Sequence, residues 1–176
     1  MLACKPRDRK GIIEGKEGIG LRSLQPKKDA VQLMKEVNKE EWIQVYKNIL
    51  SNADAHAWSA ISGDLIIGQL DIYTIVAGEL GKHFPARSND AVLQYRIHQP
   101  ATSLMHREIL WLFMQYYFNH PSTELLYGQA EIYENKTCRL YENAGFVFQQ
   151  NTMLGNQAIS LYLMTRYRFN EERKKI

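Results

Sequence analysis

The sequence predicts an α+β protein in which helices pack on one mixed β-sheet. Two observations carry this prediction. The apolar residues switch several times between the period of two that is typical of strands and the three-and-four spacing that is typical of helices. After Ala91 the predicted order is strand, helix, strand and helix, a unit that should contain a parallel crossover. The 176 residues, 45% of them hydrophobic, suit a single core.

The N-terminal region divides into an arm and the beginning of the domain. Residues 1–17 are charged, contain glycine and lack an apolar period, so we expect a flexible N-terminal arm. The domain is expected to cover residues 18–170, followed by a charged C-terminal tail at residues 171–176. Its first element is a short strand at Gly20–Leu24.

Two helices are expected next. Pro26–Asp29 has the composition of a turn, and Asp29 is a suitable N-cap for the helix that follows. Glu41–Leu50 predicts the second helix, because its apolar side chains lie three and four positions apart. The apolar positions of the two helices are Val31, Leu33, Met34 and Val37, and then Trp42, Val45, Tyr46 and Ile49.

The pattern then changes to that of strands. Ala57–Ile61 and Leu65–Val76 are rich in Ile, Trp and Tyr, and turn residues separate them at Ser62–Asp64, so we expect a β-hairpin. Gly78–Asn89 is a polar, irregular connection. Ala91–His98 alternates apolar and polar residues and predicts a strand.

The C-terminal half alternates helices and strands. Met105–Phe118 carries the apolar stripe of an amphipathic helix, and a loop leads from it to a strand at Glu124–Ala130. A helix is expected at Asn135–Asn143, with Gly145 as its left-handed terminator. Two strands complete the domain, Phe146–Gln149 and Ile159–Arg168.

Composition argues against several classes of protein. The net charge of +3 comes largely from the two ends of the chain, so we expect no nucleic-acid binding. No apolar run approaches the length of a membrane span, and no apolar export segment precedes the small residues near Met1, so we expect a cytoplasmic protein without a membrane partner. Cys4 and Cys138 are too few for a cysteine zinc site, and the histidines are not paired with carboxylates, so no metal is expected.

One C-terminal segment combines an acidic residue, an asparagine, a Leu-Tyr pair and an Ala-Gly-Phe end: Glu131-Ile-Tyr-Glu-Asn135-Lys-Thr-Cys-Arg-Leu-Tyr141-Glu-Asn-Ala-Gly145-Phe146. It resembles the second cofactor-binding motif of the GCN5-related N-acetyltransferase (GNAT) superfamily. Ile67–Tyr73, the strand after Asp90 and Leu161–Phe169 resemble strands of one branch, which includes aminoglycoside 6′-N-acetyltransferases and the hydroxylysine acetyltransferases of siderophore biosynthesis. The resemblance covers approximately Ile19–Phe169.

The resemblance implies a fold and a reaction. The fold is the GNAT acyl-CoA N-acyltransferase fold, a central twisted mixed sheet of about six or seven strands flanked by about four helices. The reaction is transfer of an acetyl group from the co-substrate acetyl-CoA to an amine, by direct attack on the thioester. Two strands should part beside Tyr141 and leave a slot for the pantetheine arm. Tyr141 occupies the position of the general acid and Asn135 that of a pantetheine contact; the alternatives are a core tyrosine and a helix N-cap.

The loop that binds the pyrophosphate in this family is altered here. Family members carry glycines at the start of the long helix, where backbone N–H groups surround the phosphates, whereas Ala101–Glu108 contains none. Backbone donors and the helix dipole persist with any side chain, so binding is still implied, in a weaker or altered pose. The alternative is a packed helix start capped by Thr102 or Ser103. His106 replaces a loop glycine, and we expect it to face solvent. The expected cofactor-binding residues are Ile97, His98, Thr102, Ser103, Leu104, Met105, His106, Arg107, Asn135 and Tyr141.

The acceptor end of the site is less well defined by the resemblance. Asp90 matches an aspartate of the siderophore branch, and Gln94 stands where that branch has a histidine, so both join Tyr141 as catalytic candidates, although glutamine cannot take a proton. Candidates for a protein base are Asp71, Glu79, His83, Asp90 and His98, with surface or strand-edge roles as the alternative. Substrate contacts are expected from Asp71, Tyr73 and Phe84, with Trp58 as a further candidate.

Three functions are consistent with these features. The first is N-acetylation of a small-molecule amine or hydroxylamine, such as a siderophore precursor, an aminoglycoside or a polyamine-like compound. The second is that of a catalytically degenerate paralogue that binds CoA or another ligand as a regulatory module. The third is acetylation of a protein N-terminus or lysine. A homodimer paired through sheet edges is also compatible with the sequence.

Overall fold

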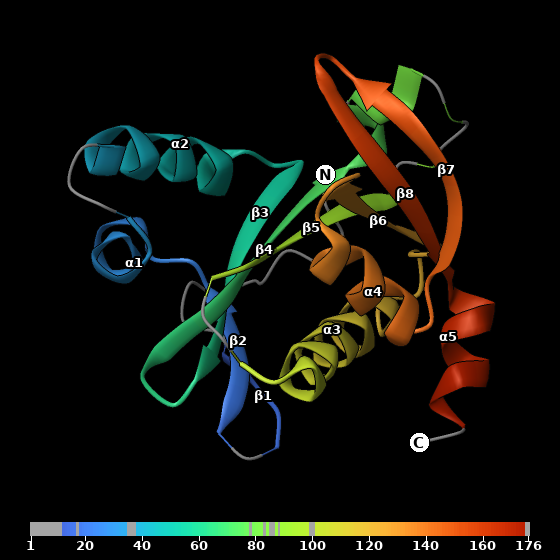
Figure 1. The fold of residues 1–176 in the computed structure, drawn as a ribbon, viewed down its shortest axis with the longest axis horizontal. Coiled ribbons are helices and arrows are strands. Elements are labelled where there is room, and N and C mark those ends of the chain that lie inside the picture. Colours follow the sequence, from blue (N-terminus) through green and yellow to red (C-terminus); the bar gives the residue numbers. More distant parts are fainter. Residues whose placement is uncertain are drawn as a thin grey trace.

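The structure is a computed structural model that describes residues 12–174 apart from Glu17, residues 35–37, Gly78, His83, Pro85, Ala86, Ser88, Gln99 and Pro100. The predicted fold class is confirmed: these residues form one mixed sheet with helices on both faces (Figure 1). The described residues contain eight strands and five α-helices, slightly more than expected.

The elements follow one another in nearly the predicted order. The N-terminal half contains β1 (Ile12–Glu14), β2 (Ile19–Ser23), α1 (Pro26–Leu33), α2 (Lys39–Ser51), β3 (Ala55–Ser62), β4 (Leu65–Thr74) and the short 3₁₀ turns η2 (Ile75–Ala77) and η3 (Glu79–Lys82). The C-terminal half contains β5 (Ala91–Ile97), α3 (Ser103–Phe118), β6 (Leu125–Glu131), α4 (Asn135–Asn143), β7 (Val147–Leu154), β8 (Gln157–Thr165) and α5 (Arg166–Arg173).

The sheet contains one parallel strand pair. Its strand order is β1-β2-β3-β4-β5-β6-β8-β7, and only β5 and β6 run parallel. Helix α3 connects these two strands, which confirms the predicted crossover. The carboxyl end of β5 therefore lies beside the carboxyl end of β6, from which α4 continues.

The two faces of the sheet carry different helices. The largest core lies between the sheet and helices α3, α4 and α5, and it contains Leu93, Tyr95, Phe113 and Tyr141. Burying a side chain such as Phe113 stabilises the fold by about 1.5–3 kcal/mol. Helices α1 and α2 lie on the other side of the sheet (Figure 1), where a small cluster centres on Tyr46. Since the side chains of a strand alternate between the two faces of the sheet, consecutive residues of β5 lie on opposite faces.

Three predictions for the N-terminal region were wrong. Ile12–Glu14 pairs with β2, so part of the predicted arm is a strand; residues 1–11 and Glu17 lie outside the described residues. Helix α1 begins at Pro26, so Asp29 is not its N-cap. The Asp29 side chain is instead fully buried, and Arg22 of β2 and Ser59 of β3 donate hydrogen bonds to its carboxylate. Val31, predicted to be apolar core, is 68% exposed.

The end of the chain also differs from the prediction. Strand β8 stops at Thr165, and Arg166–Arg173 forms helix α5 in place of the end of a strand and part of the tail. The Thr165 hydroxyl accepts a hydrogen bond from the Arg168 backbone N–H at 3.1 Å and so caps the helix. Phe169 anchors α5 by stacking against Phe118 of α3, with ring centroids 5.1 Å apart. None of the helices in the described part of the chain has the length and apolar character needed to cross a membrane.

Candidate functional site

The central feature of the site is that β5 and β6 part halfway along their length. Their paired residues run from Ala91 with Leu126 to Gln94 with Gln129. Both strands continue beyond this point, to Ile97 and Glu131, without further pairing. A slot therefore opens between the carboxyl ends of the only parallel pair, where ligands of α/β sheets commonly bind.

Tyr141 of α4 fills the apex of this slot. Its side chain is fully buried, and its hydroxyl donates to the Leu93 carbonyl at 3.0 Å and accepts from the Tyr95 backbone N–H at 3.1 Å. The hydroxyl thus binds β5 at the place where β6 turns away, since Leu93 still pairs with Gly128 whereas Tyr95 lies beyond the last pair. Burial raises the pKa of Tyr141 above its ordinary value of 10, so the phenol keeps its proton and can donate it.

A glycine on β6 makes room for this tyrosine. A Cβ atom at Gly128 would lie 2.8 Å from Cε1 of the Tyr141 ring, which is too close for any side chain. Gly128 was not among the site residues predicted from the sequence. A glycine inside a strand pattern is nevertheless a known signal of close approach by another group, and it was available here.

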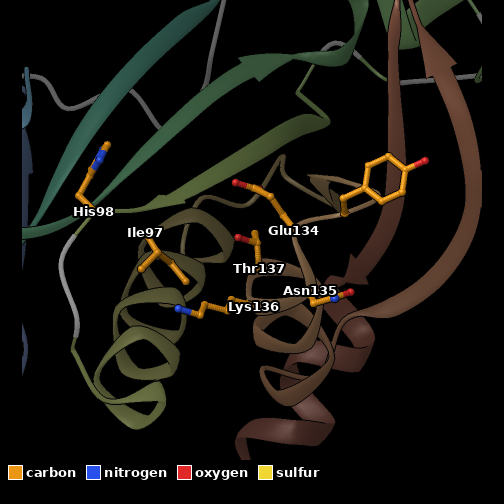
Figure 2. A pocket seen from close by; sticks show the side chains of 7 residues that line it. Ile97, His98, Glu134, Asn135, Lys136 and Thr137 are labelled. Atoms are coloured by element: carbon orange, nitrogen blue, oxygen red, sulfur yellow. The ribbon is translucent and has the colours of Figure 1, made fainter.

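A cleft of about 580 Å³ continues from the slot (Figure 2). It lies between the end of β5, at Ile97 and His98, and the start of α4, at Tyr133–Thr137. Figure 2 shows the Lys136 side chain directed toward Ile97, whereas the Asn135 side chain points away from it. The cleft therefore has one wall from β5 and one from the helix that holds Tyr141.

The structure tests one of the two roles predicted for Asn135. It is the first residue of α4, an exposed residue that lines the cleft. The N-cap position belongs to Glu134, which makes no capping bond with its side chain. The prediction of Asn135 as N-cap was therefore wrong, and its expected contact with a pantetheine arm stays a prediction.

The start of α3 follows β5 in the chain and does not line the cleft itself. Thr102 is its N-cap, as one alternative predicted, because its hydroxyl accepts from the Met105 backbone N–H at 3.2 Å. Thr102, Ser103, Leu104 and Arg107 are exposed. The first N–H groups of a helix have no acceptor within the helix, so Ser103 and Leu104 present backbone donors toward an anion.

His106 does not face solvent, and that prediction was wrong. It is only 3% exposed, and its Nδ1 atom lies 2.7 Å from the Tyr95 hydroxyl. The reason lies on β4, where a Cβ atom at Gly68 would come within 2.6 Å of the Tyr95 ring. Because Gly68 has no side chain, Tyr95 can lie across it and reach α3. His106 therefore fixes the helix start to the strand that forms the slot.

The opposite face of the sheet carries a polar group of side chains, which we name the Asp71 cluster: Tyr46, Gln69, Asp71, Gln94 and Arg96. The Asp71 carboxylate accepts from Gln69 Nε2 at 2.6 Å, from the Tyr46 hydroxyl at 2.9 Å and from Arg96 Nη1. With three donors around it, Asp71 has no oxygen ready to take a proton from a substrate. Burial and the charge of Asp71 raise the pKa of Tyr46 to about 12.

Other predicted acceptor residues lie along the same face. The Tyr73 hydroxyl donates to Gln129 Oε1 at 2.7 Å, and burial raises the pKa of Tyr73 to about 12. Phe84 packs near Tyr127, with ring centroids 6.1 Å apart. Trp58 is different: it is 1% exposed in the large core on the α3 side and does not face this region.

The candidates for a base are separated by the fold. Asp90 lies before β5, at the end away from the slot, and its oxygens accept the backbone N–H groups of Arg87 and Leu125. His98 lies on the cleft, where partial burial, followed by the nearby Arg96, lowers its pKa and keeps the ring uncharged. His83 and the side chain of Glu79 lie outside the described residues. Across the described ranges, no three His, Cys, Asp or Glu side chains form a group that could hold a metal ion.

Comparison with known proteins identifies the fold. No protein-family model and no curated protein matches this sequence. An uncharacterized protein from Bacillus halodurans superposes with a TM-score of 0.77 at 13% identity, over 89% of this chain and 88% of that chain. A probable GNAT-family acetyltransferase from Chromobacterium violaceum gives 0.71 at 11% identity, over 94% of this chain and 96% of that chain. The aminoglycoside acetyltransferase AAC(6′)-Ib, in complex with ribostamycin and coenzyme A, gives 0.75 at 15% identity, over 89% of this chain and 98% of that chain. The chain therefore has the fold of GNAT acetyltransferases.

Proposed function

We propose that this protein is an N-acetyltransferase that moves the acetyl group of acetyl-CoA to the amine or hydroxylamine of a small molecule. The observation that carries the proposal is the slot between β5 and β6, with the Tyr141 hydroxyl at its apex and a cleft of about 580 Å³ beyond it. The solved AAC(6′)-Ib complexes hold coenzyme A in a protein of the same fold, which supports this assignment.

In this proposal, the pantetheine arm and the phosphates of the co-substrate occupy different parts of the site. Its pantetheine arm would lie in the cleft between Ile97 and the start of α4. Its phosphates would meet the free N–H groups at the start of α3, where the helix dipole favours anions. Lys136, directed toward Ile97, and the exposed Arg107 add positive charge that offsets the missing glycines.

The reaction needs few protein groups. The amine attacks the thioester carbonyl, a C–N bond forms, and the C–S bond breaks to release a thiolate. Tyr141, protonated and at the slot apex, would give its proton to the thiolate sulfur. The proton lost by the amine would pass to His98, which lies on the cleft and is uncharged. By chemistry alone, siderophore precursors and polyamine-like compounds belong to this class of acceptor.

A second function is favoured by one specific observation. The Tyr141 hydroxyl is already engaged on both sides, by Leu93 and by Tyr95. Together with the glycine-free start of α3, this arrangement suits a protein that binds CoA without turning it over. Binding and turnover must therefore be measured separately.

The test uses the full chain. We expect isothermal titration to detect acetyl-CoA binding, and an amine panel to give thiol release. Tyr141→Phe should lower turnover by about 10²–10⁴-fold, because the proton donor is lost. The variant also loses the hydrogen bonds to Leu93 and Tyr95, so its acetyl-CoA affinity and its stability are measured beside the rate. Tyr167→Phe, at an exposed tyrosine on α5, is the matched control and should behave like the parent protein.

The outcomes separate the alternatives. Binding without thiol release for any small amine, but with release for peptides, would support protein acetylation. Binding without release for either class supports the regulatory module. Absence of acetyl-CoA binding contradicts the proposal altogether.

A further inference from the structure

Arg96 lies beside the slot, on the face of the sheet that carries the Asp71 cluster. It follows Gln94 by two residues, and Gln94 is the last residue of β5 that pairs with β6. On one side Arg96 pairs with Gln69 of β4, and on the other side β6 has already turned away. Its side chain is 41% exposed although its partner Asp71 is 12% exposed. The Arg96 side chain is therefore more exposed to solvent than the Asp71 carboxylate that it binds.

The cluster holds this guanidinium in a fixed place. Nη1 donates to the Asp71 carboxylate and to the Tyr46 hydroxyl, the latter at 2.9 Å. Nη2 donates to Gln94 Oε1 at 2.9 Å. A guanidinium has five N–H groups, so Nε–H and one Nη2–H have no partner among the residues that the structure describes. The Nε and Nη2 atoms form one edge of the group, and it is through this edge that an arginine can bind a carboxylate with two parallel hydrogen bonds.

The carboxylate of the cluster is already engaged by donors. The Asp71 oxygens accept from Gln69, Tyr46 and Arg96, so its negative charge is already neutralised. The Oε1 atom of Gln94 accepts from Arg96, which directs the amide nitrogen of Gln94 as a further donor. His98, the residue after the end of β5, is uncharged because its pKa is lowered. A cationic group placed beside the guanidinium would meet a positive charge and a carboxylate that three donors already engage.

We propose that the acceptor carries a carboxylate in addition to its amine, and that Arg96 binds this carboxylate beside the slot. The inference rests on the proposed function and narrows its substrate class to amino acids and related amino carboxylates. Arg96 positions the substrate, with the Gln94 amide nitrogen as a second donor. This preference is opposite to that for a polycation, for which the site would need exposed acidic groups.

The test compares three probes that differ at one end only. 5-Aminopentanoate, pentylamine and 1,5-diaminopentane share a terminal amine and a five-carbon chain, with a carboxylate, a methyl group or an ammonium at the other end; homologues one carbon shorter and longer cover the unknown distance to the slot. We expect 5-aminopentanoate or a homologue to show kcat/KM at least tenfold above its two counterparts. The same order should appear in direct titrations of the CoA-saturated protein.

Two variants test the role of Arg96 without leaving the buried charge of Asp71 unpaired. Arg96→Lys retains the charge beside Asp71 but loses the two-donor edge, so the preference for the carboxylate should fall several-fold through KM with kcat little changed. The double change Arg96→Gln with Asp71→Asn removes both charges together, so no buried charge is left alone, and the preference should disappear. Arg139→Gln, at an exposed arginine of α4, is the control and should keep it.

The outcomes distinguish this inference from the function on which it rests. Equal or better binding of pentylamine or 1,5-diaminopentane, or no binding of any amino carboxylate in the series, overturns the inference even when acetyl-CoA binds. Selective binding of the amino carboxylates without thiol release supports the inference and contradicts the proposed turnover.

Discussion

At the scale of single residues, the slot depends on a tyrosine that lies against a glycine. Tyr141 fills the apex because Gly128 presents no side chain to its ring. The family motif indicated Tyr141 in the sequence, since it belongs to a local pattern. Gly128 could not be paired with it by sequence alone, because 13 positions separate the two and only the packing of α4 on β6 brings them together.

Gly128→Ala tests this contact. The added methyl group would overlap the Tyr141 ring, so we expect the free energy of unfolding to fall by about 1–3 kcal/mol, and turnover to fall with it as the hydroxyl moves. Urea denaturation and a thiol-release assay measure the two effects. Gly20→Ala on β2, whose nearest contact is a milder 3.2 Å, is the control. Unchanged stability of Gly128→Ala would show that α4 shifts at no cost.

A second prediction at the residue scale concerns the pKa of His98. Its pKa is lowered from 6.5, so the folded protein favours the uncharged ring. Its contribution to stability is therefore present above pH 6.5 and is lost as the pH falls through the lower pKa of the folded state. If His98 is the base, kcat/KM should show an acid limb below pH 6.5, and His98→Gln should lower the rate and flatten that limb. An unchanged limb in the variant removes His98 from this role.

At the scale of elements, α3 begins with a side-chain cap in place of a glycine loop. The cap, Thr102, was predictable because threonine before an apolar period is a local signal. The burial of His106 was not predictable, because it depends on Tyr95 of β5 and on Gly68 of β4. The start of α3 is thus held by a cap on its own chain and by a bond to the sheet.

Two caps in this chain allow a matched test. Thr102→Ala and Thr165→Ala each remove the hydroxyl that caps a helix, α3 and α5 respectively. Each should lower the free energy of unfolding by about 0.5–2 kcal/mol. Only Thr102→Ala should also weaken acetyl-CoA binding, since only α3 borders the proposed phosphate site. Equal affinities in both variants, measured by titration, would place the phosphates elsewhere.

At the scale of the whole molecule, the sheet separates an apolar core on one face from a polar cluster on the other. The α3 side carries the large core and the start of α3. The other side, on which α1 and α2 lie (Figure 1), carries the Asp71 cluster. Backbone pairing between β5 and β6 stops at the slot, which lies between these two regions. In the proposed function, the co-substrate and the acceptor would meet there from opposite sides.

A thermal shift tests this arrangement in the whole protein. A ligand that binds the native state alone stabilises it by about 2.7 kcal/mol at one hundred times its dissociation constant. For a chain of this length we expect acetyl-CoA to raise Tm by roughly 5–10 °C at that concentration. Adenosine 3′,5′-bisphosphate, which lacks the pantetheine arm, is the control and should raise it less. Equal shifts would mean that the slot contributes nothing to binding.

The order of β2 to β8 and the bounds and glycine terminator of α4 could be predicted from the sequence, because each depends mainly on residues close in the chain, whereas β1 and α5 were missed. The parallel pair followed from the order strand, helix, strand. The tertiary structure alone decided which polar residues are buried. Asp29, Asp71 and His106 each look like surface residues in the sequence, yet each lies under a partner from a distant strand or helix. Burial of a polar group is stable only where such a partner satisfies it, and that pairing is a property of the folded chain.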